Sequence, residues 1–166
     1  IAAGVKYVND HTSHNGWIFK TDSKGTILWE QVLGGNSADL LYSIKQTLDG
    51  GYIAAGYSES NDGDFSNNHG DFDYWVVKLD NSGNLEWQKL FGGSKIDQAY
   101  SIEQGGDGNY LVAGHTYSSN GDVTGLHGIN DYWVVKLDGV GNILWQKVYG
   151  GSSNDNAICN VLIICI

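Results

Sequence analysis

A unit of 58 residues repeats along this chain of 166 residues, and the period limits what the chain can fold into. The segment DYWVVKLD at residues 73–80 recurs at residues 131–138. All six tryptophans fall at two positions of the repeat, the first Trp position (Trp17, Trp75, Trp133) and the second Trp position (Trp29, Trp87, Trp145). A fixed period indicates a repeat architecture, in which each unit buries its apolar face against its neighbours.

Each period contains four runs that are typical of β-strands. In the middle of the chain these runs are residues 74–79, 85–91, 99–104 and 110–115, separated by segments rich in Gly, Asn, Asp and Ser. No segment has a convincing helical period. Four short strands per unit predict an all-β fold, a β-propeller-like array of four-stranded antiparallel blades. We expect the tryptophans to be core residues that pack between blades. The alternative is that they stack against a ligand.

The repeat predicts a single domain of just under three blades. Residues 1–35 form a partial blade, residues 36–93 and 94–151 two full repeats, and residues 152–166 a truncated, aberrant start of the next. The first copy is six residues shorter between Gly4 and Trp17 than its counterparts, so we expect a surface loop there. Closed propellers usually need at least about four blades. We therefore expect an incomplete propeller, whose partners are missing blades of the same protein or another copy.

Both ends of the chain interrupt the repeat. The chain starts in mid-repeat at Ile1, so a signal peptide would lie upstream of it, and the pattern fails after Asp155. Both cysteines, Cys159 and Cys165, lie in the failing stretch. A reading-frame error or an open-ended gene fragment is our hypothesis for residues 158–166. Two cysteines so placed support neither a disulfide framework nor a cysteine-based metal site.

Three segments carry a resemblance to a known family. Residues 101–114 (SIEQGGDGNYLVAG), 132–138 (YWVVKLD) and 141–147 (GNILWQK) resemble the secreted and cell-surface β-propeller repeats of Bacteroidetes and archaeal type. The resemblance covers residues 1–157 and implies a large exported or surface protein, often with adhesion modules, and no catalytic residues. Asp80, Gly83 and Trp87 are also similar to the tryptophan-docking motif of quinoprotein propellers, but the turn is about one residue tighter, so quinone binding does not carry over.

The charge of the chain excludes some partners. Nine basic and 19 acidic side chains give a formal net charge of −10. Nucleic-acid binding needs clustered Lys and Arg, so a nucleic-acid partner is excluded, and an anionic membrane surface is disfavoured. No apolar run approaches the roughly 20 residues that span a bilayer. We therefore expect neither a nucleic-acid partner nor membrane insertion.

Two polar loops are the candidate metal sites. Oxygen-bearing side chains occupy alternate positions in both: Asp62, Asp64, Ser66 in one and Asn120, Asp122, Thr124 in the other. This spacing resembles the start of a calcium loop, although the bidentate Glu of a full loop is missing. The alternative is that these side chains cap turns by accepting backbone N–H groups. We accordingly predict either that the chain has no cofactor or that it binds Ca²⁺ at these loops.

Other polar residues recur once per repeat. His69 and His127 share a position but have no ligand partners at metal spacing, so a structural or exposed role is the better interpretation. Asp39, Asp97 and Asp155 each follow a Gly-Gly pair by four positions. A repeated Asp at a loop–strand junction usually satisfies backbone donors, whereas a catalytic group is normally single.

These observations predict a non-enzymatic propeller segment of a larger exported or cell-surface protein, with a scaffold, adhesion or protein-interaction role. The first alternative is a carbohydrate-binding propeller that uses the Asn/Asp/His loops and exposed aromatic residues on glycans. An enzyme on a propeller scaffold is the less favoured alternative, because nucleophile and phosphate-binding motifs are absent.

Overall fold

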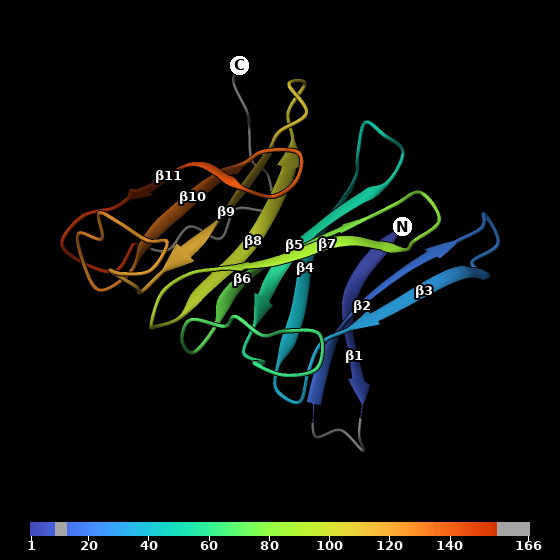
Figure 1. The fold of residues 1–166 in the computed structure, drawn as a ribbon, viewed down its shortest axis with the longest axis horizontal. Helices are drawn as coiled ribbons and strands as arrows, with labels where there is room; N and C mark the ends of the chain where they lie inside the picture. The colour runs from blue at the N-terminus through green and yellow to red at the C-terminus, as the bar shows by residue number, and fades with distance from the viewer. Residues whose placement is uncertain (9–12, 156–166) are drawn as a thin grey trace.

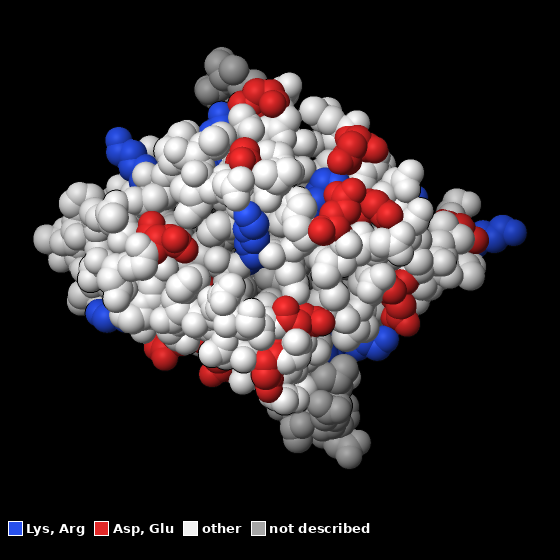
Figure 2. All heavy atoms as spheres, in the orientation of Figure 1, with Lys and Arg blue, Asp and Glu red and all other residues white. Residues whose placement is uncertain are grey.

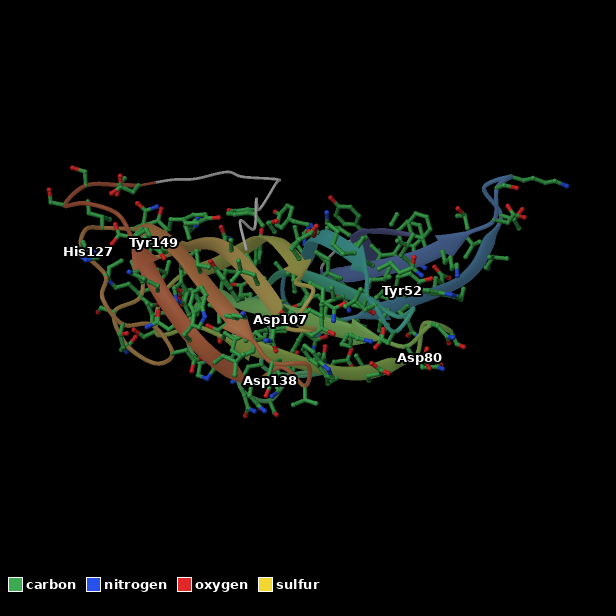
Figure 3. All side chains as sticks on the ribbon, turned by 90° about the horizontal axis from the view of Figure 1, so that it is seen from above. Tyr52, Asp80, Asp107, His127, Asp138 and Tyr149 are labelled. Atoms are coloured by element: carbon green, nitrogen blue, oxygen red, sulfur yellow. The ribbon has the colours of Figure 1, made fainter. Side chains whose placement is uncertain are left out.

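Equivalent turns reverse the chain at residues 22–26, 80–84 and 138–142. In the computed structural model, which describes residues 1–8 and 13–155, the backbone N–H groups of Gly25, Gly83 and Gly141 donate to the carbonyls of Asp22, Asp80 and Asp138. Gly83 has a φ of 86°, a left-handed conformation that glycine adopts with little strain. Asp80 and Asp138 lie along the same side of the molecule (Figure 3).

The described residues form eleven strands and no helix, which confirms the all-β prediction (Figure 1). Among these residues there is accordingly no helix long and apolar enough to cross a membrane. The strands are β1 (Ala2–Val8), β2 (Ser13–Thr21), β3 (Ile27–Leu33), β4 (Asp39–Gln46), β5 (Tyr52–Ser58), β6 (Asp73–Leu79), β7 (Leu85–Phe91), β8 (Asp97–Gln104), β9 (Tyr110–Thr116), β10 (Asp131–Leu137) and β11 (Ile143–Tyr149).

Three separate antiparallel sheets follow one another along the chain. Sheet 1 has the order β1-β2-β3, sheet 2 the order β4-β5-β6-β7 and sheet 3 the order β8-β9-β10-β11. Every pairing joins strands that are consecutive in the sequence. Figure 1 shows sheet 2 between the other two, and contacts of β4 with β1 and β2 and of β8 with β4, β5 and β6 join the sheets. No sheet closes on itself in the described part of the chain.

The strand register aligns the shortened first copy with the others. Gly4, Gly56 and Gly114 lie directly opposite the residues of the first Trp position, Trp17, Trp75 and Trp133. A β-bulge in β4 and in β8 pushes one extra residue, Tyr42 or Tyr100, out of register. The bulge brings the carbonyls of Leu40 and Gln98 against Gly56 and Gly114, where a Cβ atom would not fit.

The core lies between the sheets rather than within one of them. Trp75 is fully buried and packs with Ile18 and Leu33 of sheet 1 and with Leu41 and Phe65 of its own repeat. Trp133 is fully buried against Tyr74 of sheet 2, with ring centroids 4.5 Å apart. The hydroxyl of Tyr74 also donates to the Trp133 carbonyl at 3.0 Å. The first Trp position therefore points back toward the preceding sheet.

The second Trp position points forward, toward the turn of the next sheet. Trp29 of sheet 1 lies 5.5 Å from the ring of Tyr52 in sheet 2. Three adjacent ring carbons of Trp29 lie 2.6–2.8 Å from where a Cβ of Gly83 would stand, which places this glycine over the ring face. Trp87 meets Tyr110 and Gly141 of sheet 3 in the same way, with a ring centroid distance of 6.0 Å to Tyr110.

Two of the tryptophans expected in the core are more exposed than their counterparts at the same repeat position. Trp145 is 44% exposed, because no sheet follows sheet 3 within the described residues. Trp17 is half-buried, and its ring stacks against Phe19 at 4.4 Å within sheet 1. Core packing therefore depends on having a neighbouring sheet on the correct side. Cys159, Cys165 and the failing stretch 158–166 lie outside the described residues.

Candidate functional site

The two polar loops join β5 to β6 and β9 to β10, and they hold the crossings between sheets. Asp64 Oδ2 accepts the Gly34 backbone N–H at 2.9 Å, and Asp122 Oδ2 accepts the equivalent N–H of Gly92 at 3.2 Å. Gly34 lies between sheets 1 and 2, and Gly92 lies between sheets 2 and 3. Each loop thus fixes the crossing that precedes its own sheet.

The remaining candidate calcium ligands are engaged in the same manner. Asp62 Oδ1 accepts the Asn36 N–H at 2.9 Å, and Asn120 Oδ1 accepts the Ser94 N–H at 2.9 Å. Thr124 Oγ1 accepts a hydrogen bond from Gln146 of β11, whereas Ser66 lies exposed on its loop. These contacts fit turn capping. In residues 1–8 and 13–155, no group of three or more His, Cys, Asp or Glu side chains is placed to hold a metal ion.

A buried aspartate anchors the first strand of sheets 2 and 3. Asp97 Oδ2 accepts the Gly93 N–H and the Ser118 hydroxyl, each at 2.8 Å, and Oδ1 accepts the Thr116 hydroxyl. Burial raises the pKa of Asp97 to about 6, although these three hydrogen bonds act in the opposite direction. Asp39 repeats the arrangement with Gly35, Ser58 and Ser60, and burial raises its pKa as well.

The repeated histidines each pair with an aspartate four residues later. The His69 backbone N–H donates to Asp73 Oδ2 at 2.7 Å, and His69 Nδ1 lies 2.6 Å from the same oxygen. The corresponding Nδ1–Oδ2 distance from His127 to Asp131 is 3.4 Å. Asp73 and Asp131 are fully buried, and the Oδ1 atom of each has no hydrogen-bond partner among the described residues. Burial raises the pKa of Asp73, against the hydrogen bonds from His69.

Three carboxylates converge at the crossing between sheets 2 and 3. Asp122 binds the N–H of Gly92, while Asp73 Oδ1 and Asp97 Oδ2 both lie close to where a Cβ of Gly92 would stand. The negative charge of Asp122 contributes to the raised pKa of Asp73, and that of Asp73 contributes to the raised pKa of Asp97. Gly92 has no side chain that would displace these groups, so the carboxylates can approach the backbone closely.

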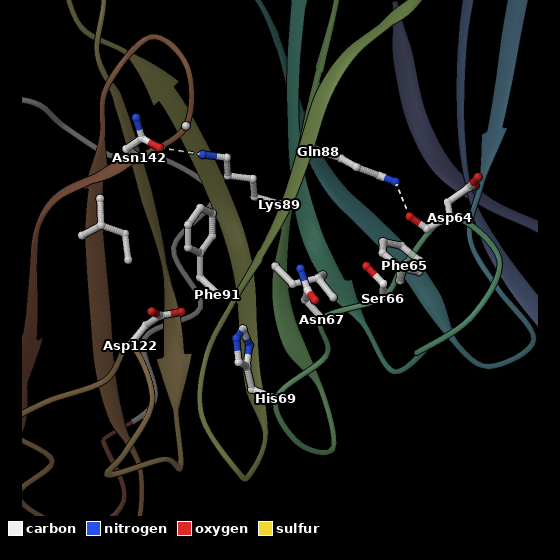
Figure 4. Close-up of a pocket in the computed structure, with 13 residues that line it drawn as sticks. Asp64, Phe65, Ser66, Asn67, His69, Gln88, Lys89, Phe91, Asp122 and Asn142 are labelled. Carbon is white, nitrogen blue, oxygen red and sulfur yellow. Dashed lines mark hydrogen bonds between the residues drawn. The ribbon is translucent and has the colours of Figure 1, made fainter.

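A cavity of about 780 Å³ lies beside the edge strand β7 (Figure 4). Residues of the β5–β6 loop form one wall, and the turn before β11 forms the other. The Lys89 side chain reaches from sheet 2 to sheet 3, where its Nζ donates to Asn142 Oδ1 at 2.8 Å. The polar side chains that line the cavity are Asp64, Ser66, Asn67, His69, Gln88, Lys89, Asp122 and Asn142. The cavity is of the size of small-ligand sites, which span about 300–1,000 Å³.

A row of aromatic rings crosses from sheet 2 to sheet 3 through the two bulges. Tyr42 and Tyr100, the extra residues of the bulges, lie 5.4 Å apart between ring centroids. The row continues through Tyr57 and Phe72 on one side and through His115 and Tyr117 on the other, with neighbouring centroids 5.0–5.6 Å apart. Tyr42 is 50% exposed. The 58-residue spacing of Tyr42 and Tyr100 was visible in the sequence, but the bulge that aligns them was not.

Comparison with protein-family models and with curated proteins finds no match. The functional interpretation therefore depends on the geometry. The candidate residues divide between a structural set at the sheet crossings and the lining of the cavity. Asp64, Ser66 and Asp122 belong to the cavity as well as to the loops.

Proposed function

We propose that the chain is a propeller-like, non-enzymatic scaffold segment that acts by presenting loops and by joining further sheets. The observation that carries the proposal is the repeated sheet contact, because Trp29 with Gly83 and Trp87 with Gly141 use the same residue types at the same repeat positions. A stack held by one repeated contact extends by adding further copies of the same unit. The role fits the resemblance to exported and cell-surface repeats, so secretion or surface display belongs to the proposal.

Repetition also supports the non-enzymatic role. The hydrogen bonds of Asp39 and Asp97 serve the same backbone positions in successive repeats, as do those of Asp64 and Asp122. A catalytic centre normally occurs once in a chain, whereas a structural device recurs. The raised pKa of Asp97 follows from burial, and its oxygens accept hydrogen bonds from two hydroxyls and a backbone N–H.

Cooperative unfolding tests the scaffold proposal. A stacked module should unfold in one transition, and Trp87→Leu should lower the midpoint because it removes the contact between sheets 2 and 3. Trp145→Leu, measured at low protein concentration and low ionic strength, is the matched control, since the same substitution at the same repeat position removes a side chain that is 44% exposed. Independent transitions in the unmodified protein, or equal losses in the two variants, would show that the sheets do not act as one module.

Carbohydrate binding in the cavity beside β7 is the second candidate function. Its polar lining combines amide, carboxylate, hydroxyl and ammonium groups, which together can donate to and accept from sugar hydroxyls. An array of neutral glycans, followed by titration calorimetry of the best one, tests the idea. Asn67→Ala in the cavity should weaken binding, and Asn81→Ala in an exposed turn outside it should not. Loss of binding with Tyr42→Ala alone would assign the glycan to the aromatic row instead.

A further inference from the structure

The two internal contacts between sheets share one arrangement, in which a tryptophan of one sheet lies over a turn glycine of the next. We call the tryptophan the donor and the glycine the acceptor of this packing contact. The donor is a residue of the second Trp position, which lies on the last strand of its sheet. The acceptor is the turn glycine of the following sheet: Gly83 for Trp29 and Gly141 for Trp87. Both glycines have left-handed φ values, 86° and 79°, and both lie against the face of the indole.

Among residues 1–8 and 13–155, the outer faces of the array carry the same donor and acceptor without a neighbouring sheet. On sheet 3, Trp145 is 44% exposed beside Leu144 and Tyr149, which are 52% and 47% exposed. On sheet 1, Gly25 occupies the acceptor position with a φ of 85°, and no atom lies within 4 Å of where its Cβ would stand. Ile27, next to this turn, is 46% exposed.

A second contact between the sheets runs in the opposite direction. Trp75 lies against Gly16 of the preceding sheet, and Trp133 stacks on Tyr74, which occupies the position of Gly16 one repeat later. Trp17 is the equivalent donor on sheet 1, and Tyr132 stands at the corresponding position of sheet 3. The outer faces are therefore complementary through two reciprocal contacts, one in each direction.

We propose that sheet 3 of one copy docks on sheet 1 of a second copy, with Trp145 of one chain over Gly25 of the other. The contact is head-to-tail, so its two surfaces differ and lie at opposite ends of the same chain. A second copy of the chain fits this face because the equivalent face of sheet 2 is covered by the equivalent turn of sheet 3. The inference rests on the proposed scaffold function, and it specifies the partner and the residues in contact.

Charge sets the conditions under which the contact forms. Each copy carries a formal net charge of −10, and Figure 2 shows acidic side chains spread over the visible face, so two copies repel one another at low ionic strength. The contact itself is largely apolar, and salt screens the repulsion without weakening apolar burial. Association should therefore become stronger as sodium chloride is added, which distinguishes it from association through ion pairs.

Sedimentation velocity on two complementary variants tests the proposal. Trp145→Ser removes the donor, and Gly25→Asn fills the acceptor with a residue that tolerates the left-handed conformation. The unmodified chain should associate as its concentration rises, and each variant alone should associate at least ~10-fold more weakly, as expected when a central aromatic contact is lost. An equimolar mixture of the two variants should form a dimer, because each variant retains the surface that the other lacks.

Leu48→Ser provides the matched control, since Leu48 is 74% exposed in the turn between β4 and β5, away from both faces. This variant should associate like the unmodified chain. A chain that stays monomeric up to millimolar concentration in high salt, or a mixture that fails to form dimers while both variants keep the unmodified circular dichroism spectrum, would overturn the docking proposal. The scaffold function would still stand if Trp87→Leu lowers the unfolding midpoint as described above.

Discussion

Alanine substitutions at the three turn glycines separate backbone strain from the contact with tryptophan. Gly25, Gly83 and Gly141 share the left-handed conformation, so each alanine should cost about 1–2 kcal/mol in backbone energy. At Gly25 the new methyl group meets nothing within 4 Å, and the backbone term should be the whole loss. At Gly83 the methyl group would stand 2.6–2.8 Å from ring carbons of Trp29, and at Gly141 2.9–3.1 Å from those of Trp87.

Overpacking of this kind typically costs about 1–3 kcal/mol. Gly83→Ala should therefore lose about 2–5 kcal/mol in total, Gly141→Ala somewhat less, and Gly25→Ala only the backbone term. Urea unfolding followed by tryptophan fluorescence measures all three losses. Equal losses at the three positions would refute the inter-sheet contact. As a further check, the excess loss at Gly83 should disappear in a Trp29→Leu background, because the ring that the methyl group strikes is then gone.

Three other predictions concern polar groups of the core and of the loops. Burial raises the pKa of Asp97 from 3.8 to about 6, so its contribution to stability is complete below pH 4 and is lost as the pH rises through 6. Relative to Asp97→Asn, the unmodified protein should lose about 2 kcal/mol between pH 4 and pH 7 in urea unfolding, and parallel pH profiles would contradict this. Tyr74→Phe removes the hydroxyl that donates to the Trp133 carbonyl, and it should cost about 1–2 kcal/mol, whereas Tyr149→Phe, at a ring that is 47% exposed, should cost almost nothing. Because the loop oxygens already bind backbone N–H groups, millimolar calcium should give no heat in calorimetry. A binding heat that disappears in Asp122→Asn would instead support a calcium site in this loop.

The strands were predictable because two local signals coincide in this chain. Runs of β-branched and aromatic residues alternate with Gly, Asn and Asp turns, and each assignment recurs in two or three copies of the repeat. Residues 85–91 and 110–115 of the sequence become Leu85–Phe91 and Tyr110–Thr116 in the structure. Short turns join most neighbouring strands of a sheet and require antiparallel pairing, whereas the longer loops 59–72 and 117–130 do not by themselves fix the pairing of the strands they connect.

Features that depend on the distance between sheets were not predictable. The exposure of Trp145 differs from that of Trp87 only because a sheet covers one and not the other. The cavity beside β7 arises where the β5–β6 loop and the turn before β11 approach from different repeats. The loop oxygens could be singled out in the sequence because they recur at matching positions of the repeat. Their donors, the N–H groups of Gly34 and Gly92, lie 30 residues earlier in the chain, and only the fold brings them within reach.

Ring-current shifts of the turn glycines give the most direct test of the repeated sheet contact. Protons above an indole face resonate upfield, and Gly83 and Gly141 lie over the rings of Trp29 and Trp87, whereas Gly25 has no atom within 4 Å of its Cβ position. In a proton–carbon correlation spectrum, we expect the Hα resonances of Gly83 and Gly141 to lie well upfield of those of Gly25. Trp29→Leu should return the Gly83 resonances alone to the position of Gly25. Three glycines with the same Hα shifts in the unmodified protein would contradict the stacking of the sheets through this contact.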